Sequence, residues 1–421
     1  MKYWSFIKDP LYGYIHITEL ERDVIDTLAL QRLRRIKQLV FADYVYPGAN
    51  HTRFEHSVGV MHLAGLLARS LPEEFSEEEI QEVRLAGLLH DVGHGPFSHT
   101  FEQLLMRRLG KTHEDLAPWI ILNTELKDII ESYGYSAERV AKLAVGRLRD
   151  EKKPYLDQII QSAVDVDKMD FIMRDSYHTG AEYGKVDIYR LIYTMEIYGD
   201  TLAVSATALP TLEAFVIARI ESFRAIYYHK TARAGQILLV RAMELADDDI
   251  GLTSFRDVHD YLKLDDYYVW TMLRNHEEAG RIMADLERRK LLKCAYERIF
   301  HVHDEAVSSL LTNDSVRKRV EEEIARRAGV KEEEIAIDVP SLPSIPYFHT
   351  MKMDPMEIPV VEERAGQKVL RKAAELSKVI EVLKGFMNII RVYTVEEHKD
   401  MVRQAAEEIL GKPPETIRVS Y

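Results

Sequence analysis

Histidines are concentrated in one part of the 421-residue sequence, close to acidic residues that could share a metal ion with them. Seven of the 16 histidines lie between residues 51 and 113. Arg53–His56 opens one stretch of helical spacing, His90–Asp91 closes a second, and Asp165–Asp170 lies in a third. Histidine is the most common metal ligand in proteins and the usual proton carrier near neutral pH. These three segments are therefore the first candidates for chemistry.

One divalent ion could be held by two imidazoles and two carboxylates, from His56, His90, Asp91 and Asp167. Such a mixed set of nitrogen and oxygen donors suits Mn, Fe, Ni, Zn or Mg, with water in the remaining positions. An ion of this kind lowers the pKa of a bound water molecule and polarises a phosphoryl oxygen. The sequence therefore predicts a metal site able to support hydrolysis of a phosphate ester. Asp165 and Asp170 flank Asp167 and are expected to cap the helix or to support the ligands.

Helical spacing of apolar residues dominates the first 300 residues and must position these side chains. Alternating aromatic and polar residues, broken by Pro10 and Gly13, predict a β-hairpin over residues 1–20. Helical spacing begins at about residue 21. Further helices are expected at about 55–71, 78–91, 98–109, 114–132, 136–149, 155–174, 187–198, 209–230, 231–247, 255–264, 266–274 and 275–289, with a strand at 201–205.

The pattern changes after about residue 300. Residues 319–328 predict a charged helix, and residues 338–366 carry five of the 14 prolines, which is typical of loop and edge strand. Residues 378–393 indicate a strand or a helix that leads into one. Thr394 and Glu397 form a capping-box pattern for a final helix. We expect a mainly α protein, with a helical domain over 1–330 and a smaller α+β region over 331–421.

Composition excludes several classes of protein. With 56 basic and 69 acidic residues the net charge is −13, which argues against a protein that coats duplex nucleic acid. The single cysteine, Cys294, allows no intrachain disulfide and fits a reducing, cytoplasmic location. The absence of a long apolar run predicts no membrane span. Locally, residues 31–53 contain five basic residues and one acidic residue, so a small anionic substrate remains possible.

Longer motifs surround the candidate ligands and resemble a known family. Residues Gln31–Leu39, Phe54–Val60, His90–His99 and Asp165–Lys168 resemble the HD-domain metal-dependent phosphohydrolases. Within that superfamily the sequence of these motifs is most similar to the deoxynucleoside triphosphate triphosphohydrolase branch, whose vertebrate members add a sterile-alpha-motif domain. The resemblance is dense from about 20 to 235 and thinner in the tail. It implies an HD-domain helical core with the four ligands described above.

The resemblance also implies roles for the residues around the metal. His99, supported by Glu102 and His113, would form a catalytic proton relay, and His94 would lie near the α-phosphate. Positions that contact the phosphates and sugar of the substrate match Gln38, Leu39, Arg53, Lys168, Asp175, Arg219 and Tyr227. Phe171 departs from the family pattern, which has a phosphate-contacting tyrosine there. The implied reaction is attack at the α-phosphorus, which releases deoxynucleoside and inorganic triphosphate.

A second, regulatory nucleotide site is implied by a further set of matches. A GTP or dGTP activator would contact Asp26, Gln31 and Arg34, a neighbouring dNTP would contact Val45, Asp187, Arg190, His229 and Lys230, and Arg391 would reach an activator phosphate. Additional Mg would accompany the nucleotides. These sites lie between subunits in the family, so a homodimer or homotetramer is expected. Ala225 and Val395 stand where the family has basic residues.

Three functions remain open from the sequence. The leading hypothesis is a metal-dependent dNTP triphosphohydrolase that nucleotides regulate. Phe171 motivates a second, a phosphatase on a nucleoside monophosphate or a phosphodiesterase. The third is a nucleotide-sensing or nucleic-acid-binding oligomer with weak turnover. The remaining histidines of the cluster, His51 and His62, are expected to be structural or to lie at the surface.

Overall fold

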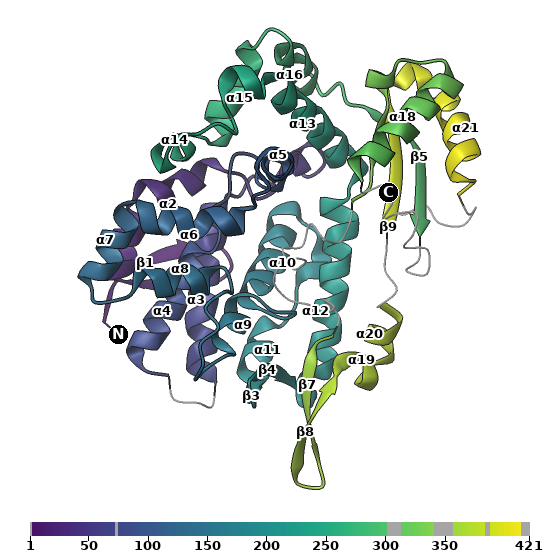
Figure 1. Cartoon of the computed structure of the whole chain (residues 1–421). Helices are drawn as coiled ribbons and strands as arrows, with labels where there is room; N and C mark the ends of the chain where they lie inside the picture. The colour runs from purple at the N-terminus through teal and green to yellow at the C-terminus, as the bar shows by residue number, and fades with distance from the viewer. Residues whose placement is uncertain (1, 72–74, 301–312, 341–356, 384–387, 414–421) are drawn as a thin grey trace.

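The N-terminal hairpin forms as the alternation predicts. The computed structural model describes residues 2–71, 75–300, 313–340, 357–383 and 388–413 (Figure 1). Strand β1 (Tyr3–Asp9) pairs antiparallel with β2 (Gly13–Thr18). The Asp9 carboxylate accepts hydrogen bonds from the backbone N–H groups of Leu11 and Tyr12, and Gly13 adopts a φ of +73° to close the turn. Ile15 and Ile17 bury one face of the hairpin against the helices.

A helical body makes up most of the molecule and centres on α3 (Arg53–Ser70). Thirteen of its 18 residues are buried, because α4 and α10 pack on it from different sides. Around it lie α1 (Glu19–Ile25), α2 (Leu28–Arg32), α4 (Glu77–Leu89), α5 (His99–Leu109), α6 (His113–Asn123), α7 (Glu125–Ser132), α8 (Ala137–Ala144), α9 (Leu156–Ile160), α10 (Val166–Thr179), α11 (Ile188–Thr194), α12 (Leu209–Ser222), α13 (Lys230–Ile250), α14 (Val258–Leu262), α15 (Asp266–Asn275) and α16 (Ala279–Glu287).

Several predicted helices are interrupted where a polar side chain accepts a hydrogen bond from a backbone N–H two or three residues later. The helical pattern after residue 21 divides into α1 and α2, because Thr27 caps α2 through the Leu30 N–H. The predicted helix 155–174 divides in the same way, since Asp165 caps α10 through the Lys168 N–H at 2.8 Å. The helix expected at 114–132 becomes α6 and α7. The helix expected at 209–230 ends at Ser222 and continues as a π-helical turn over Phe223–Tyr227.

A four-stranded sheet projects from the helical body at the lower end of Figure 1. The predicted strand at 201–205 is confirmed as β4 (Thr201–Ser205). Residues 195–198, predicted as helix, form β3 (Met195–Tyr198) instead, because they pair antiparallel with β4 through a tight turn. Part of the proline-rich segment supplies β7 (Pro359–Arg364), parallel to β4, and β8 (Gln367–Lys372) follows that segment and pairs antiparallel with β7. Residues 341–356 of that segment lie outside the described residues.

The C-terminal sheet joins distant parts of the chain. Its order is β5 (Lys293–Phe300), β9 (Asn388–Thr394) and β6 (Ala336–Asp338), all antiparallel. Helices α18 (Asp314–Ala328) and α21 (Lys399–Leu410) pack on it around a separate core that includes Tyr296, Ile324 and Val392. Short helices α19 (Ala373–Leu376) and α20 (Lys378–Leu383) follow β8. The final helix starts at Lys399 after a 3-10 turn, and Thr394 ends β9 rather than capping it.

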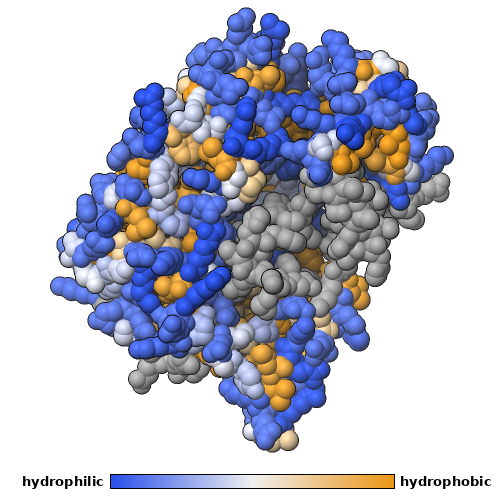
Figure 2. Space-filling view, viewed as in Figure 1, coloured by the Kyte–Doolittle hydropathy of each residue, from blue (hydrophilic) through white to orange (hydrophobic). Residues whose placement is uncertain are grey.

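The predicted fold class is confirmed: a helical core, a short N-terminal hairpin and a C-terminal α+β region. The boundary at residue 330 stays a prediction, and β5 comes from the earlier side of it. Figure 2 shows a mostly hydrophilic face on which hydrophobic residues are scattered in small groups. None of the helices in the described ranges has both the length and the apolar character needed to cross a bilayer.

Candidate active site

Three helices bring the four predicted metal ligands together at the centre of the helical body. His56 lies in the first turn of α3, His90 and Asp91 follow the end of α4, and Asp167 lies in the first turn of α10. The Nε2 atom of His56 is 3.0 Å from Oδ1 of Asp167 and 3.7 Å from Oδ2 of Asp91. The Nε2 atom of His90 is 3.3 Å from Oδ1 of Asp91 and 3.7 Å from Oδ1 of Asp167.

Both imidazoles are oriented so that Nε2 faces this cluster. Nδ1 of His56 donates to Oδ2 of Asp170 at 2.8 Å, and Nδ1 of His90 donates to the Gly87 carbonyl at 2.8 Å. This arrangement is typical of metal-binding histidines, whose second ring nitrogen is fixed by a carboxylate or a carbonyl. Nε2 of His90 is buried and has no hydrogen-bond partner among the described residues. The donor set therefore fits a divalent cation.

The electrostatics of the cluster point the same way. Burial alone would raise the pKa of the Asp91 carboxyl, but Arg53, His90 and His94 outweigh it and hold that pKa well below its usual range. Burial would lower the pKa of His56, yet hydrogen bonds to Asp167 and Asp170 raise it to about 10. The ionised carboxylates are stabilised by positive charge between them, and a divalent cation would supply that charge.

A chain of hydrogen bonds supports the cluster from behind. Asp170 also accepts from Nε and Nη2 of Arg174 at 2.8 and 2.9 Å. Nη1 of Arg174 in turn donates to Oδ2 of Asp9 in the hairpin turn at 2.8 Å. Arg174 and Asp170 are fully buried. The N-terminal hairpin is therefore connected through Arg174 and Asp170 to the candidate ligand His56.

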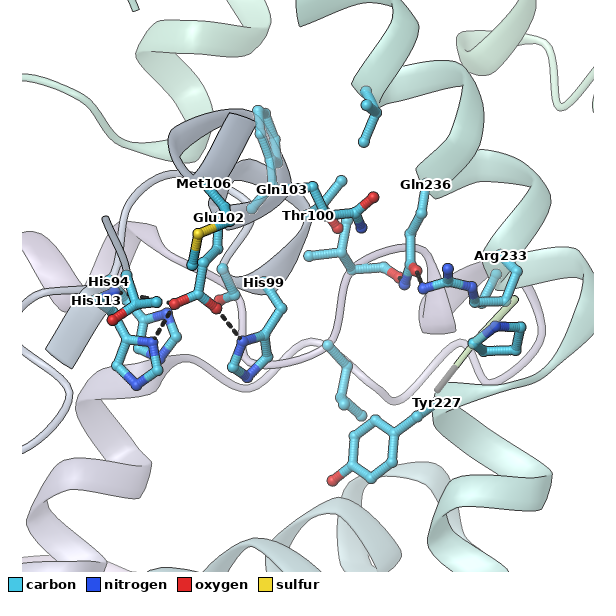
Figure 3. A pocket seen from close by; sticks show the side chains of 18 of the residues that line it. His94, His99, Thr100, Glu102, Gln103, Met106, His113, Tyr227, Arg233 and Gln236 are labelled. Atoms are coloured by element: carbon cyan, nitrogen blue, oxygen red, sulfur yellow. Dashed lines mark hydrogen bonds and ion pairs between the residues drawn. The ribbon is translucent and has the colours of Figure 1, made fainter. Parts of the chain in front are cut away.

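The predicted relay residues meet in a second cluster beside the first. Figure 3 shows Glu102 between the rings of His113 and His99, with His94 next to His113. Oε2 of Glu102 accepts from Nδ1 of His99 at 2.8 Å, and Oε1 accepts from Nδ1 of His113 at 2.7 Å. The ring of His94 stacks on that of His113 with centroids 3.8 Å apart. His94 also joins the two clusters, since its Nε2 is 3.3 Å from Oδ1 of Asp91.

Charge is shared unequally within this second cluster. Burial opposes ionisation of Glu102, but His113 and His99 hold the pKa of its carboxyl well below the usual range. Burial would lower the pKa of His113, whereas Glu102 raises it to about 9. Burial and the nearby Arg53 lower the pKa of His94. At neutral pH the structure therefore holds an ionised Glu102, a protonated His113 and a neutral His94.

Both clusters open into one cavity of about 1020 Å³. Its wall includes most of the predicted substrate residues, namely Gln38, Leu39, Arg53, Lys168, Arg219 and Tyr227, together with Phe171. Oε1 of Gln38 is buried without a hydrogen-bond partner among the described residues, so it can accept one from a ligand. Figure 3 shows Tyr227, Arg233 and Gln236 on the wall opposite the histidines. The cavity thus combines cationic side chains, among them Arg53, Lys168 and Arg219, with the two clusters.

Asp175 is the predicted substrate residue whose position differs from the expectation. It is fully buried behind the cavity wall. Its carboxylate accepts a hydrogen bond from the Tyr227 hydroxyl and contacts Nε2 of His51 at 2.7 Å. His51, expected to be structural or at the surface, is buried and stacks on His178.

The predicted regulatory residues form separate groups away from this cavity. Gln31 accepts from Nε of Arg34 at 2.9 Å on an exposed corner that Asp26 shares. Asp187 caps α11 through the Arg190 N–H, and His229 caps α13 through the Thr231 N–H. Val45 is partly buried after a 3-10 turn, and Lys230 lines a smaller pocket of about 540 Å³.

Arg391 is buried and already bonded, which the resemblance did not indicate. Its Nε donates to Glu297 at 2.5 Å, and its Nη1 donates to the Tyr228 carbonyl.

Three further residues contact the site without having been predicted: Arg174, Ser98 and Asp266. Ser98 and Asp266 make contacts with segments far apart in the sequence, for which spacing carries no signal. Arg174 pairs with Asp170 at helical i,i+4 spacing, but its contact with Asp9 spans 165 positions. The flanking residue Asp170, by contrast, supports a ligand as expected.

Comparison with known families gives two matches. The model described as HD domain matches residues 53–174, and the model described as HD associated region matches residues 186–420. The first spans all four candidate metal ligands and the relay. The second includes the strands and helices of the C-terminal region.

Similar proteins come from bacteria, archaea and animals. A solved structure of a hypothetical protein from Aquifex aeolicus has a TM-score of 0.77 and 31% identity, covering 95% of this chain and 99% of that one. An uncharacterized protein from Methanocaldococcus jannaschii is 33% identical over 68% of this chain and 58% of its own length. The human deoxynucleoside triphosphate triphosphohydrolase SAMHD1 is 32% identical over 68% of this chain and 54% of its own. The chain therefore spans little more than half the length of these two relatives.

Proposed function

The chain belongs to the HD-domain family of metal-dependent phosphohydrolases, and on that premise we propose that it hydrolyses deoxynucleoside triphosphates to deoxynucleoside and inorganic triphosphate. One observation carries the proposal: the candidate metal cluster, the His99–Glu102–His113 group and the cationic side chains Arg53, Lys168 and Arg219 line the same cavity. Several relatives of 29–33% identity are named deoxynucleoside triphosphate triphosphohydrolases, from Dictyostelium to human.

Each part of the cavity would have a separate task. His56, His90, Asp91 and Asp167 would hold one divalent ion, which supplies charge to phosphoryl oxygens and activates a water molecule when bound. Arg53, Lys168 and Arg219 would bind the phosphate oxygens and align the α-phosphorus for attack by water. Tyr227 and Gln38 would contact the sugar.

The leaving group needs a proton, and His99 can supply it. Attack at the α-phosphorus breaks the bond to the 5′-oxygen, and that oxygen must be protonated as it departs. Glu102 engages Nδ1 of His99, so Nε2 is the ring nitrogen left to donate. Glu102 would hold the imidazole in place and stabilise its charge, while His113 neutralises the other carboxylate oxygen.

A product assay tests the proposal. Purified protein is incubated with each dNTP, with Mn²⁺, Mg²⁺, Fe²⁺, Ni²⁺ or Zn²⁺, and with GTP or dGTP as an optional activator, and products are separated by chromatography. We expect deoxynucleoside and triphosphate in equal amounts. His99→Asn should slow turnover by about 10²- to 10⁴-fold, whereas the exposed His259→Asn should not. Absence of both products under every combination would refute the proposal.

A second candidate function rests on Phe171. This side chain lines the cavity with its ring 6.1 Å from that of Tyr227, and it offers no hydroxyl to a phosphate. A phosphatase on a nucleoside monophosphate, or a phosphodiesterase, would need fewer phosphate contacts. Orthophosphate released from a dNMP, with dNTPs left intact, selects the first of these. Cleavage of a dinucleotide with dNTPs left intact selects the second.

Regulation and assembly are a further part of the proposal. We propose that the Asp26, Gln31 and Arg34 corner binds an activating nucleotide between subunits of a homodimer or homotetramer, within the cytoplasm. The 2.9 Å hydrogen bond between Arg34 and Gln31 holds their side chains together at the surface, which supports this role. Arg34→Ala should abolish activation by GTP but leave chain fold and metal content unchanged. Light scattering with and without GTP reports the oligomeric state.

A further inference from the structure

The turn that precedes His99 has an unusual backbone. Phe97 and Ser98 adopt φ values of 58° and 52°, and neither is glycine. Two consecutive left-handed residues are strained for L-amino acids and persist only when surrounding contacts hold them. His99 is the first residue of α5 and follows this turn directly. The position of its imidazole is therefore set by the backbone of Phe97 and Ser98.

One buried carboxylate holds this turn from outside the HD helices. Oδ1 of Asp266 accepts a hydrogen bond from the Phe97 N–H at 2.6 Å, and Oδ2 accepts one from the Lys37 N–H at 2.9 Å. Ser98 completes the connection, since its hydroxyl donates to the Lys37 carbonyl at 2.8 Å. Asp266, Phe97, Ser98 and Lys37 thus form a closed ring of contacts. Ser98 also accepts from Nε of Arg53 at 2.7 Å, and Arg53 contacts the ligand Asp91 at 2.5 Å.

The segment that carries Asp266 touches the same loop at two further points. The Tyr261 hydroxyl donates to the Gly93 carbonyl at 2.7 Å. Arg32 connects the Leu264 carbonyl to the His94 carbonyl, with both bonds at 2.8 Å. Helix α14 lies against α2 and α6, which flank the loop (Figure 1). Residues 261–266 therefore hold residues 93–97 through several polar contacts, one of them by way of Arg32.

The environment of Asp266 suggests a task other than stability. Burial raises the pKa of its carboxyl to about 6, because two backbone N–H groups and the more distant Lys37 amine offset burial only in part. A buried carboxylate without a bonded counter-ion destabilises the folded state relative to a neutral group. The contribution of this carboxylate therefore lies in the geometry that it imposes on the two backbone N–H groups.

We propose that Asp266 is a positioning residue for catalysis, whose carboxylate holds the strained Phe97–Ser98 turn and thereby places the His99 imidazole at the cavity. The inference rests on the proposed function, because it takes His99 to act on the substrate. Helices α14 and α15, which lie in the HD associated region, would complete an active site whose ligands all lie in the HD domain.

The test compares Asp266→Asn with Asp265→Asn. The first variant keeps the size of the side chain but cannot accept from both N–H groups, because its amide nitrogen is a donor. The second removes the charge from a neighbour that caps α15 and pairs with Arg35 but does not contact the loop. We expect Asp266→Asn to lower kcat by about 10- to 100-fold with KM and metal content within twofold of wild type. Asp265→Asn should leave kcat within twofold.

A double-mutant cycle separates positioning from general damage. If Asp266 acts through His99, Asp266→Asn should cost less than twofold in a His99→Asn background. An undiminished loss in that background, an equal loss in Asp265→Asn, or an unchanged kcat in Asp266→Asn would each overturn the proposal.

Hydrogen exchange provides a readout that does not depend on turnover. Amides of residues 97–100 should exchange faster in Asp266→Asn than in wild type, and Asp265→Asn should leave them unchanged. If wild-type protein hydrolyses no nucleotide, the proposed function fails. Amide hydrogen exchange of residues 97–100 then tests by itself whether Asp266 stabilises the turn. Unchanged exchange in Asp266→Asn would refute that stabilisation.

Discussion

Nδ1 of His56 donates a hydrogen bond to Oδ2 of Asp170 at 2.8 Å, so the imidazole can present only Nε2 to the metal cluster. Carboxylates in this position typically contribute 10- to 100-fold to metal affinity. Asp170→Asn should therefore weaken Mn²⁺ binding by about 10- to 100-fold, as measured by calorimetric titration. Asp157→Asn is a matched control, because Asp157 is a buried carboxylate that accepts two backbone N–H bonds far from the ligands. Equal affinities in wild type and Asp170→Asn would contradict this role.

The close approach of α10 to α3 depends on Gly59. A Cβ atom at this position would lie 2.0 Å from Oδ1 of Asp170 and 2.4 Å from Nη2 of Arg174. Gly59→Ala should displace both and destabilise the fold by about 1–3 kcal/mol, with loss of metal affinity. Gly65→Ala on the same helix would meet the buried Arg84 side chain at 2.8 Å, which contacts Glu21 and none of the candidate ligands. It should keep metal affinity, and urea unfolding with metal titration on both variants checks the difference.

Stability should fall at alkaline pH because of His113. Its pKa is raised from 6.5 to about 9 by Glu102 in spite of burial. A raised histidine pKa stabilises the folded state fully below pH 6.5, and that contribution disappears as pH rises through 9. The loss is about 3 kcal/mol at most. Urea unfolding of the metal-free protein between pH 6 and 10 should show it, and His113→Gln should flatten this part of the profile. A wild-type profile as flat as that of the variant would argue against the pair.

Phe171→Tyr tests whether the cavity holds a triphosphate. The new hydroxyl would point from the wall into the cavity, at the position where the resembled family has a phosphate-contacting tyrosine. A hydrogen bond to a charged group contributes about 1.5–3 kcal/mol, so KM for dNTPs should fall by roughly 10-fold or more. Phe223→Tyr, on the same cavity wall, is the control and should leave KM unchanged. A KM that rises in Phe171→Tyr would favour a smaller substrate.

Local spacing was sufficient for part of the site. His99 and Glu102 are three residues apart on α5, and helical geometry alone brings such side chains together. The alternation in residues 3–18 likewise determined the hairpin. Residue types and motifs indicated the four candidate metal ligands, and the structure brings His56 to 3.0 Å from Asp167 and His90 to 3.3 Å from Asp91.

Other features depend on contacts between distant residues. Asp175 accepts a hydrogen bond from the Tyr227 hydroxyl, 52 positions away, and is fully buried. The spacing of residues 195–198 predicts a helix, but these residues form strand β3. Their conformation is determined by pairing with β4 and not by their own pattern. The breaks after α1, α6 and α9 arose where side chains outcompeted helical hydrogen bonds.

The sequence by itself determined which side chains are available for chemistry, since imidazoles and carboxylates of the types that suit a divalent ion lie in motifs that resemble the HD-domain phosphohydrolases. Only the tertiary structure decided how these side chains are positioned relative to one another. The carboxylate of Asp266 meets the Phe97 N–H across 169 positions. Arg174 joins the hairpin turn to the ligand His56 through Asp170. No local period encodes such contacts, because they form only when packing of the whole core brings the segments together.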